Sequence, residues 1–424
     1  MGIAMFVVFL LLLALGVPII FVLGLTSAIY MIASGTPLIA LAQRMFVGMD
    51  SFVLMAIPFY ILVGNLMSSG DITRQIVKWC RTLVGHIPGG LAHVNVLASV
   101  LFAGISGSAS ADTSAVGGIL IPAMVDEGYD VDFSSAVTVA SSCLSPIIPP
   151  SIVFVVYAVV AEVSIAEMFM AGIVPGLLMA AFQMAVVVHF ARKRSYPISS
   201  KRATFKDVLV ETRRSLPVLL GPAIILVGIL SGVFTPTEAG VIAAAYVGIL
   251  AFVSKRVTLR DLPKILLSTA TTTAGAYLIV AMASAFAWIL TIEQVPQTIA
   301  SALLSGISNP LIILLLINAM LLVVGTFMEP VSALIILVPI LLPIAKAAGI
   351  DPIHLGVVMS VNLIIGFITP PVGTCLFIAS GISKISVERI SKAVLPFLAS
   401  NVAALLLTTF CPSLALSLPR LILR

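Results

Sequence analysis

Charged residues are scarce in this sequence. Only 9% of the 424 residues are Asp, Glu, Lys or Arg, whereas 60% are hydrophobic and the mean hydropathy is +1.23. A soluble domain needs a far more polar surface, so this composition excludes one. Since one membrane crossing takes roughly 20 residues, the chain has room for about ten spans and some re-entrant segments. We expect an all-α polytopic membrane protein.

Residues that support metal, redox or hydrolytic chemistry are also few. The four histidines are dispersed, and no two of the four cysteines form a C-x-x-C pair. The cysteines are Cys80, Cys143, Cys375 and Cys411. Neither a disulfide framework nor a zinc site is predicted. The sequence also lacks H-E-x-x-H, G-x-S-x-G and G-x-x-x-x-G-K-[ST] motifs, so we expect no enzyme activity, no cofactor, no ATP-driven step and no nucleic-acid partner.

A basic region is missing from the start of the chain. MGIAMFVVFLLLLALG carries no Lys or Arg and continues into the apolar run PIIFVLGLTSAIYMIAS. A cleaved signal peptide begins with a basic stretch. The first 34 residues therefore predict two mature membrane helices.

The basic residues that do occur gather in four clusters. These are Arg74, Lys78 and Arg81; Arg192, Lys193, Arg194, Lys201, Arg202, Lys206, Arg213 and Arg214; Lys255, Arg256, Arg260 and Lys264; and Lys384, Arg389 and Lys392. Because cytoplasmic loops carry the excess of Lys and Arg, all four are expected in the cytoplasm. The largest predicts a basic loop at 193–214 that meets anionic membrane lipid. Segments 35–46 and 293–310 contain one basic residue between them, Arg44, and are therefore expected on the periplasmic or extracellular side.

The two halves of the chain repeat each other. Seven anchor residues recur 221 positions later without a gap (325 − 104 = 221). They are Gly104, Pro122, Gly128, Asp130, Pro149, Pro150 and Pro175, matched by Gly325, Pro343, Gly349, Asp351, Pro370, Pro371 and Pro396. This spacing predicts an internal repeat, with residues 1–192 as the first unit and 215–424 as the second.

Corresponding loops of the two halves carry opposite charge patterns. The basic segment 74–81 corresponds to 293–310, which lacks Lys and Arg, and the nearly uncharged 35–50 corresponds to the basic 254–264. The repeats are therefore predicted to insert upside down relative to each other, which is typical of secondary transporters. The acidic loop 126–132 fits this scheme poorly, although acidic residues weigh little in the rule.

In each half, a break separates two apolar runs. The breaks are ISGSASADTS in the first half and TFMEPVS in the second. Each following limb is too short for a full crossing, so we expect re-entrant helical hairpins at about 94–125 and 311–346. Irregular backbone at membrane depth is stable only against protein or a watery cavity. The two hairpin tips should therefore meet near the midplane.

A second break in each half contains paired prolines. SPIIPPS (145–151) and ITPPVGT (368–374) interrupt runs that otherwise predict single crossings, at about 133–163 and 353–382. Proline has no amide donor and so releases an upstream carbonyl. Such carbonyls can bind a small cation, and the start of the next half-helix favours an anion. The residues assigned to the helix breaks and the substrate-anion site are Ser110, Pro149, Pro150, Ser151, Pro370 and Pro371.

The stretch GISGSASADTS predicts a cation site. Ser106, Ser108 and Ser110, with nearby carbonyls, would replace water around Na⁺, and Asp112 would offset its charge. Two simpler interpretations stand beside this one: small residues let helices pack closely, and Asp112 or Glu329 can cap a helix. Intramembrane carboxylates are nonetheless functional candidates. In FTPTEAG (234–240), Glu238 is expected at a helix start that Thr235 or Thr237 caps.

Five motifs, in this order along the chain, resemble those of one family. GISGSASADTSAVGGILIPAM, SPIIPPS, FTPTEAG, GIDPIHLGV and IGFITPPVG look like the signatures of the large membrane subunit of TRAP (tripartite ATP-independent periplasmic) transporters. The resemblance covers essentially the whole chain. It implies a bacterial inner-membrane, multi-pass transporter with a scaffold and a moving transport domain, working as a Na⁺-driven elevator. It also implies two partners, a small four-helix membrane subunit on a separate chain and a periplasmic binding protein that delivers an organic anion.

The resemblance also implies two Na⁺ sites. The first would use the tip from Ser106 through Gly107 and Ser108 to Asp112, with the break around Ser145, Pro149 and Pro150. The second would use the tip from Gly325 through Thr326 to Glu329, with Thr369, Pro370, Pro371 and Gly373 in the second break. Whether each tip pairs with the break of its own half is open, as are the backbone carbonyls that ligate.

A second transporter class fits the same hairpins. This is a Na⁺- or H⁺-coupled dicarboxylate or oxyanion carrier of the wider ion-transporter group that works without a binding protein. Backbone amides and hydroxyls suit carboxylates in general. The substrate therefore stays open among C4-dicarboxylates, sialic acid, other sugar acids and keto acids.

Overall fold

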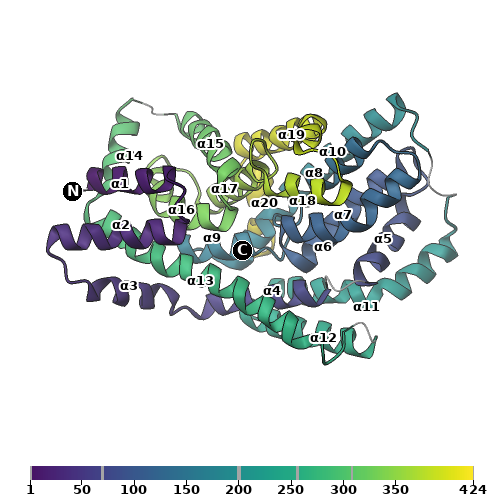
Figure 1. Ribbon diagram of the computed structural model, residues 1–424, viewed down its shortest axis with the longest axis horizontal. Helices are drawn as coiled ribbons and strands as arrows, with labels where there is room; N and C mark the ends of the chain where they lie inside the picture. Colours follow the sequence, from purple (N-terminus) through teal and green to yellow (C-terminus); the bar gives the residue numbers. More distant parts are fainter. Residues whose placement is uncertain (1, 68–70, 198–201, 255–256, 307–308, 424) are drawn as a thin grey trace.

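The computed structural model describes residues 2–67, 71–197, 202–254, 257–306 and 309–423. Over these residues the regular secondary structure is entirely helical (Figure 1). Seven of the described helices are long and apolar enough to cross a membrane, or eight if the bent pair Ile39–Met49 and Phe52–Met67 is one span. The composition therefore predicted the class correctly, a multi-pass helical membrane protein.

The helices follow one another with short connections. Their bounds are α1 Gly2–Ala14, α2 Ile19–Ser34, α3 Ile39–Met49, η1 Phe52–Met55, α4 Ala56–Met67, α5 Asp71–Val84, α6 Gly90–Ser106, α7 Ala109–Asp126, α8 Val131–Ser142, α9 Ile152–Ala161, α10 Ile165–Lys193, α11 Phe205–Leu230, α12 Pro236–Val253, α13 Leu262–Ile292, α14 Val295–Gly306, α15 Pro310–Phe327, α16 Pro330–Ala347, α17 Pro352–Gly366, α18 Thr374–Ser383, α19 Val387–Phe410 and α20 Ser413–Ile422.

The order of helices repeats along the chain. Helices α6 to α10 begin at residues 90, 109, 131, 152 and 165, and α15 to α19 begin at 310, 330, 352, 374 and 387. Each pair of starts differs by about the spacing found between the sequence anchors. The predicted hairpins correspond to α6–α7 and α15–α16, and the proline-broken runs to α8–α9 and α17–α18.

The helices form two layers. Helices α2, α3, α4, α11, α12 and α13 pack along one side of the molecule, and α6 to α10 pack with α15 to α20 on the other (Figure 1). The second layer interleaves the two halves of the chain, because α7 contacts α18 and α16 contacts α9. Both hairpins therefore belong to one packed body. Helices α4 and α13 of the first layer face this body, against α6 and α16 respectively.

The acidic loop 126–132 pairs with the basic clusters. Glu127 binds Arg81 at 2.7 Å, Asp130 binds Arg194 at 2.6 Å, and Asp132 binds Arg389 at 2.9 Å. These arginines come from three of the four clusters, so the loop and these three clusters lie on the same face. The acidic charge thus neutralises neighbouring arginines, which explains why the loop did not match the simple charge pattern.

A hydrogen bond from Tyr196 stabilises the charged form of Asp130. The Tyr196 hydroxyl donates to the Asp130 carboxylate at 2.6 Å. This bond, together with the nearby Arg194, holds the pKa of Asp130 below its usual range, although partial burial opposes the effect. The pair fixes the end of α10 against the start of α8.

Helix α11 begins inside the segment predicted as a basic loop. The loop was placed at 193–214, yet α10 runs to Lys193 and α11 starts at Phe205; residues 198–201 lie outside the described residues. A capping box explains the early start, because Thr204 accepts from Asp207 N at 3.3 Å and Asp207 accepts from Thr204 N at 2.9 Å. The prediction for Glu238 is confirmed by the same motif, in which Thr235 and Glu238 cap α12.

Candidate functional site

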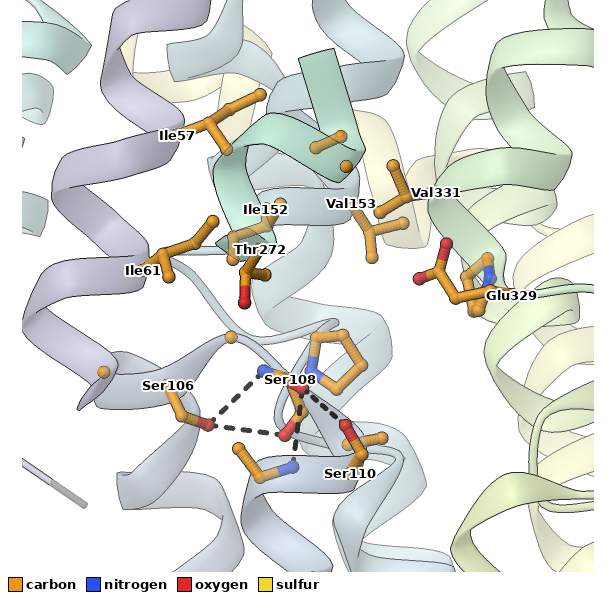
Figure 2. A pocket seen from close by; sticks show the side chains of 18 of the residues that line it. Ile57, Ile61, Ser106, Ser108, Ser110, Ile152, Val153, Thr272, Glu329 and Val331 are labelled. Carbon is orange, nitrogen blue, oxygen red and sulfur yellow. Dashed lines mark hydrogen bonds between the residues drawn. The ribbon is translucent and has the colours of Figure 1, made fainter. Parts of the chain in front are cut away.

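Both hairpin tips line one cavity of about 620 Å³ (Figure 2). Among the residues predicted for the site, five line it: Ser106, Gly107, Ser108, Ser110 and Glu329. Helices α7, α9 and α16 begin at this cavity, and residues of α4 and α13 close the opposite side. Both hairpins therefore contribute to one cavity, which lies between the two layers. That the tips meet near the membrane midplane stays a prediction.

The first tip is a chain of hydroxyl groups. Ser106 Oγ lies 3.0 Å from Ser145 Oγ, and Ser108 Oγ lies 3.1 Å from Ser110 Oγ (Figure 2 shows the three tip serines). Ser108 also caps α7, because its Oγ accepts from Ala111 N at 3.4 Å. The contact between Ser106 and Ser145 shows that the first tip pairs with the break of its own half.

Backbone carbonyls of the first break lie under this tip. Gly107 has a φ of +57°, and a Cβ added there would lie 3.1 Å from the carbonyl oxygen of Pro150. Glycine is needed at this turn both for its left-handed backbone and for the close approach. Ser145, Pro149, Pro150 and Ser151 are all buried, and Ser151 caps α9 by accepting from Phe154 N at 3.2 Å. Hydroxyls and carbonyls thus converge, as a small cation site requires.

Asp112 does not face the cavity. It lies in the first turn of α7, is 1% exposed, and neither of its oxygens has a hydrogen bond of normal geometry within the described part of the chain. Its surroundings include Ser99 and the thiols of Cys143 and Cys375. The interpretation of Asp112 as a helix cap is wrong, since Ser108 takes that position. The carboxylate sits one turn behind the tip, inside the packed body.

The second tip is built from backbone and a capping carboxylate. A Cβ added at Gly325 would lie 3.0 Å from Gly366 Cα, so this hairpin approaches α17 of its own half. The Thr326 hydroxyl donates to Val323 O at 2.7 Å. Glu329 caps α16 by accepting from Ser332 N at 3.0 Å, which confirms the capping interpretation while leaving the carboxylate at the cavity.

The second break points away from the cavity. The Thr369 hydroxyl donates to Ile365 O at 2.7 Å, and Gly373, with a φ of +45°, begins α18. Pro371 is exposed and Pro370 is half-buried. Neither these residues nor Gly325 and Thr326 line the cavity. The two breaks thus differ: the first is buried under its tip, and the second is open to the surroundings.

Polar residues of the first layer complete the cavity. Asn65 of α4 and Thr271 and Thr272 of α13 line it, and Asn65 Nδ2 donates to Thr269 Oγ1 at 2.9 Å. The breaks of the repeat do not predict these residues, because they lie outside the breaks. The signal was the hydroxyl-rich run TATTTAG at 269–275, which is unusual within a long apolar helix.

Comparison with known proteins decides the family. The family described as "Tripartite ATP-independent periplasmic transporter, DctM component" matches residues 6–414. The chain belongs to this family. The resemblance seen in the sequence motifs is therefore confirmed, and the cavity and hairpins described above belong to a TRAP large subunit.

Curated TRAP relatives cover almost all of the chain. It is 41% identical to the sialic acid TRAP transporter large permease protein SiaM of Vibrio cholerae, over 96% of both chains. It is 42% identical to the C4-dicarboxylate TRAP transporter large permease protein DctM of Pseudomonas aeruginosa, over 94% of this chain and 93% of that protein. It is also 42% identical to the isethionate TRAP transporter permease protein DctMQ of Oleidesulfovibrio alaskensis, over 96% of this chain and 64% of that longer protein.

A solved structure supports the fold. The YdaH transporter of Alcanivorax borkumensis matches with a TM-score of 0.64 at 16% identity, over 87% of this chain and 86% of that one. The curated relatives are named as permeases, which supports a transport role for this TRAP subunit and not an enzymatic one. Within the described ranges, no three His, Cys, Asp or Glu side chains are grouped as a metal centre.

Proposed function

We propose that this TRAP large subunit imports a small organic anion across the bacterial inner membrane, coupled to Na⁺. The observation that carries the proposal is the shared cavity, where both hairpin tips meet residues of the opposite layer. Ligand sites of transporters form where broken helices from two repeats converge. The relatives are named for sialic acid, C4-dicarboxylates and isethionate, which are all acids that carry negative charge at neutral pH.

Two Na⁺ ions bind at the tips in this proposal. The first is held by Ser106, Gly107, Ser108 and Ser145 with carbonyls of the proline break, and the buried charge of Asp112 balances it. The second is held around Gly325, Thr326 and Glu329, with Thr369 and Gly373 on the neighbouring break. Oxygen ligands of this kind suit a hard cation. The first site is supported by the convergence of Ser106, Ser145 and the Pro150 carbonyl.

In this proposal the two layers have different roles in transport. The body that contains the hairpins is the moving transport domain, and the layer with α4, α11, α12 and α13 is the scaffold. Inverted repeats allow the same site to open to either side of the membrane as the body moves. The repeated helix order and the position of the cavity between the layers support this elevator scheme.

Two protein partners complete the transporter. A small four-helix membrane subunit binds the scaffold, and a periplasmic binding protein delivers the anion. The longer DctMQ relative, whose name covers both permease parts, supports a second membrane subunit. The uptake assay therefore includes both partners.

Uptake into proteoliposomes tests the proposal. Vesicles that contain this chain and its small partner are mixed with the binding protein and the radiolabelled ligand that co-purifies with it. We expect accumulation when Na⁺ is higher outside, and none when K⁺ replaces Na⁺, because K⁺ is too large for sites built around Na⁺. Equal uptake in K⁺ would refute the Na⁺ sites.

A control separates the two transporter classes. The same vesicles are assayed without the binding protein. Uptake that is unaffected by its omission would assign the chain to the carriers that work alone. Loss of uptake supports the three-part transporter.

A further inference from the structure

The two ends of the cavity differ in chemistry. The hydroxyl groups of Ser106, Ser108 and Ser110 gather at one end, at the bottom of Figure 2. Mostly aliphatic side chains occupy the other end, shown above them in the same view, with Thr272 and Glu329 beside them. The aliphatic residues are Ile57, Ile61, Ile152, Val153 and Val331. A ligand that fills both ends must therefore be polar at one end and apolar at the other.

The cavity can accommodate only one anionic group. None of the described residues that line it is Lys, Arg or His, and its one charged side chain is the carboxylate of Glu329. At the serine end, a negative group meets hydroxyl donors and the N-terminus of α7, which favours an anion. In the proposed function a Na⁺ offsets Glu329, so no positive charge is left for a second carboxylate on the same ligand. Against the aliphatic side chains that second charge would be buried without a partner, which is strongly unfavourable.

A ligand with many hydroxyl groups also fits poorly. Each hydroxyl gives up hydrogen bonds to water when it enters. The aliphatic side chains offer no partner in return, and Thr272 and Glu329 are the few polar groups that lie beside them. A methylene or methyl group of the ligand that lies against these side chains raises the ligand's affinity by about fourfold. The lining therefore favours hydrocarbon over additional polar groups.

From these contacts we infer that the substrate is a monocarboxylate with an aliphatic or aromatic body, and not a dicarboxylate or a polyhydroxylated acid. The inference rests on the proposed function and names the substrate class of the same cavity. The carboxylate lies against the serines of the first tip. The hydrocarbon body lies between α4, α9 and the start of α16.

Binding to the full chain in detergent with Na⁺ tests the inference. The probes are isocaproate, adipate, succinate and N-acetylneuraminate, measured by the shift in thermal unfolding. Adipate has the same number of carbon atoms as isocaproate but carries a second carboxylate. We expect the dissociation constant of isocaproate to be lower than that of each other probe by about tenfold or more. Equal or tighter binding of any other probe, or no binding of isocaproate, overturns the inference.

Two isosteric variants locate the hydrocarbon body. Val153→Thr and Val331→Thr keep the shape of the side chain and replace a methyl group by a hydroxyl at the aliphatic end. Each is expected to weaken isocaproate binding by about fivefold to tenfold and not to weaken adipate binding, because the new hydroxyl can donate to a second carboxylate. The matched control is Val241→Thr on the surface of α12, where the side chain is 41% exposed. If the cavity variants behave like the control, the aliphatic end does not contact the substrate.

Replacing Na⁺ by K⁺ separates this inference from the proposed function. A preference for isocaproate that persists equally in K⁺ supports the substrate class and contradicts Na⁺ coupling. Na⁺-dependent binding that favours succinate or N-acetylneuraminate supports Na⁺ coupling and overturns the substrate class. Na⁺-dependent preference for isocaproate supports both.

Discussion

Asp112 poses the main electrostatic problem of the molecule. Its carboxylate is buried inside the packed body that contains both hairpins. The neighbouring Ser99 hydroxyl donates to Ser141 Oγ at 3.0 Å and not to Asp112. No described Lys or Arg forms an ion pair with it within 4 Å. A buried carboxylate without a counter-charge costs several kcal/mol, about the stability of a small domain. A cation bound near the first tip would offset this charge, which is why Asp112 is included in the proposed Na⁺ site although it does not touch the cavity.

Asp112→Asn tests this charge balance. The amide keeps the size of the side chain but removes the negative charge, so the apparent Na⁺ affinity should fall by about tenfold. The protein without Na⁺ should be as stable as the wild type or more stable, because an unpaired buried charge is gone. Thermal unfolding measured across a Na⁺ titration checks both effects. An unchanged titration curve would place the first ion away from Asp112.

The two hairpin tips show which features of the site the motifs and the repeat spacing can predict. The spacing of 221 residues correctly paired ISGSASADTS with TFMEPVS as elements that meet at one cavity, and the serine chain at the first tip follows directly from its sequence. The difference between the breaks could not be predicted. Both contain Pro-Pro, yet Pro150 is buried under Gly107 whereas Pro371 is exposed, because burial depends on which helices of the other layer lie opposite.

The cavity residues outside the breaks of the repeat could not be predicted from motif spacing either. Asn65 and Thr272 lie on helices that are far apart in the chain and outside the Pro-Pro and hairpin breaks of the repeat. Their side chains reach the site only because α4 and α13 pack side by side against the hairpin body. Such contacts depend on tertiary packing, which hydropathy and motif spacing do not specify.

The contact between α15 and α17 predicts a steric limit. A Cβ added at Gly366 would lie 2.5 Å from Gly325 Cα, and backbone cannot move aside as a flexible side chain can. Gly366→Ala should therefore lower the free energy of unfolding by about 1–3 kcal/mol, the usual cost of overpacking, and lower the melting temperature. The matched control is Gly381→Ala on α18, where an added Cβ meets nothing within 4 Å. Equal melting temperatures for the two variants would contradict the close approach.

At the scale of the whole molecule, charge pairing joins segments that are distant in sequence. Loop 126–132 brings together Arg81, Arg194 and Arg389 on one face. If that face is cytoplasmic, as the excess of basic residues indicates, the first hairpin enters from the cytoplasm. The inverted arrangement then requires the second hairpin to enter from the opposite side. Helices α5 and α14, which precede the two hairpins, should lie on opposite sides of the membrane.

Single cysteines in α5 and α14 test this arrangement. Lys78 on α5 has a side chain that is 63% exposed, and Ser301 on α14 is exposed at a nearly corresponding position. Of the native cysteines, Cys80, Cys143 and Cys375 are buried and Cys411 is exposed, so the background is Cys411→Ser. In intact cells, an impermeant maleimide should label Ser301→Cys and should reach Lys78→Cys only after the inner membrane is permeabilised. The background protein, which should not react, controls for the buried thiols. Labelling of both positions from the same side would mean that the two repeats insert in the same direction, and the elevator scheme would then lose its symmetry argument.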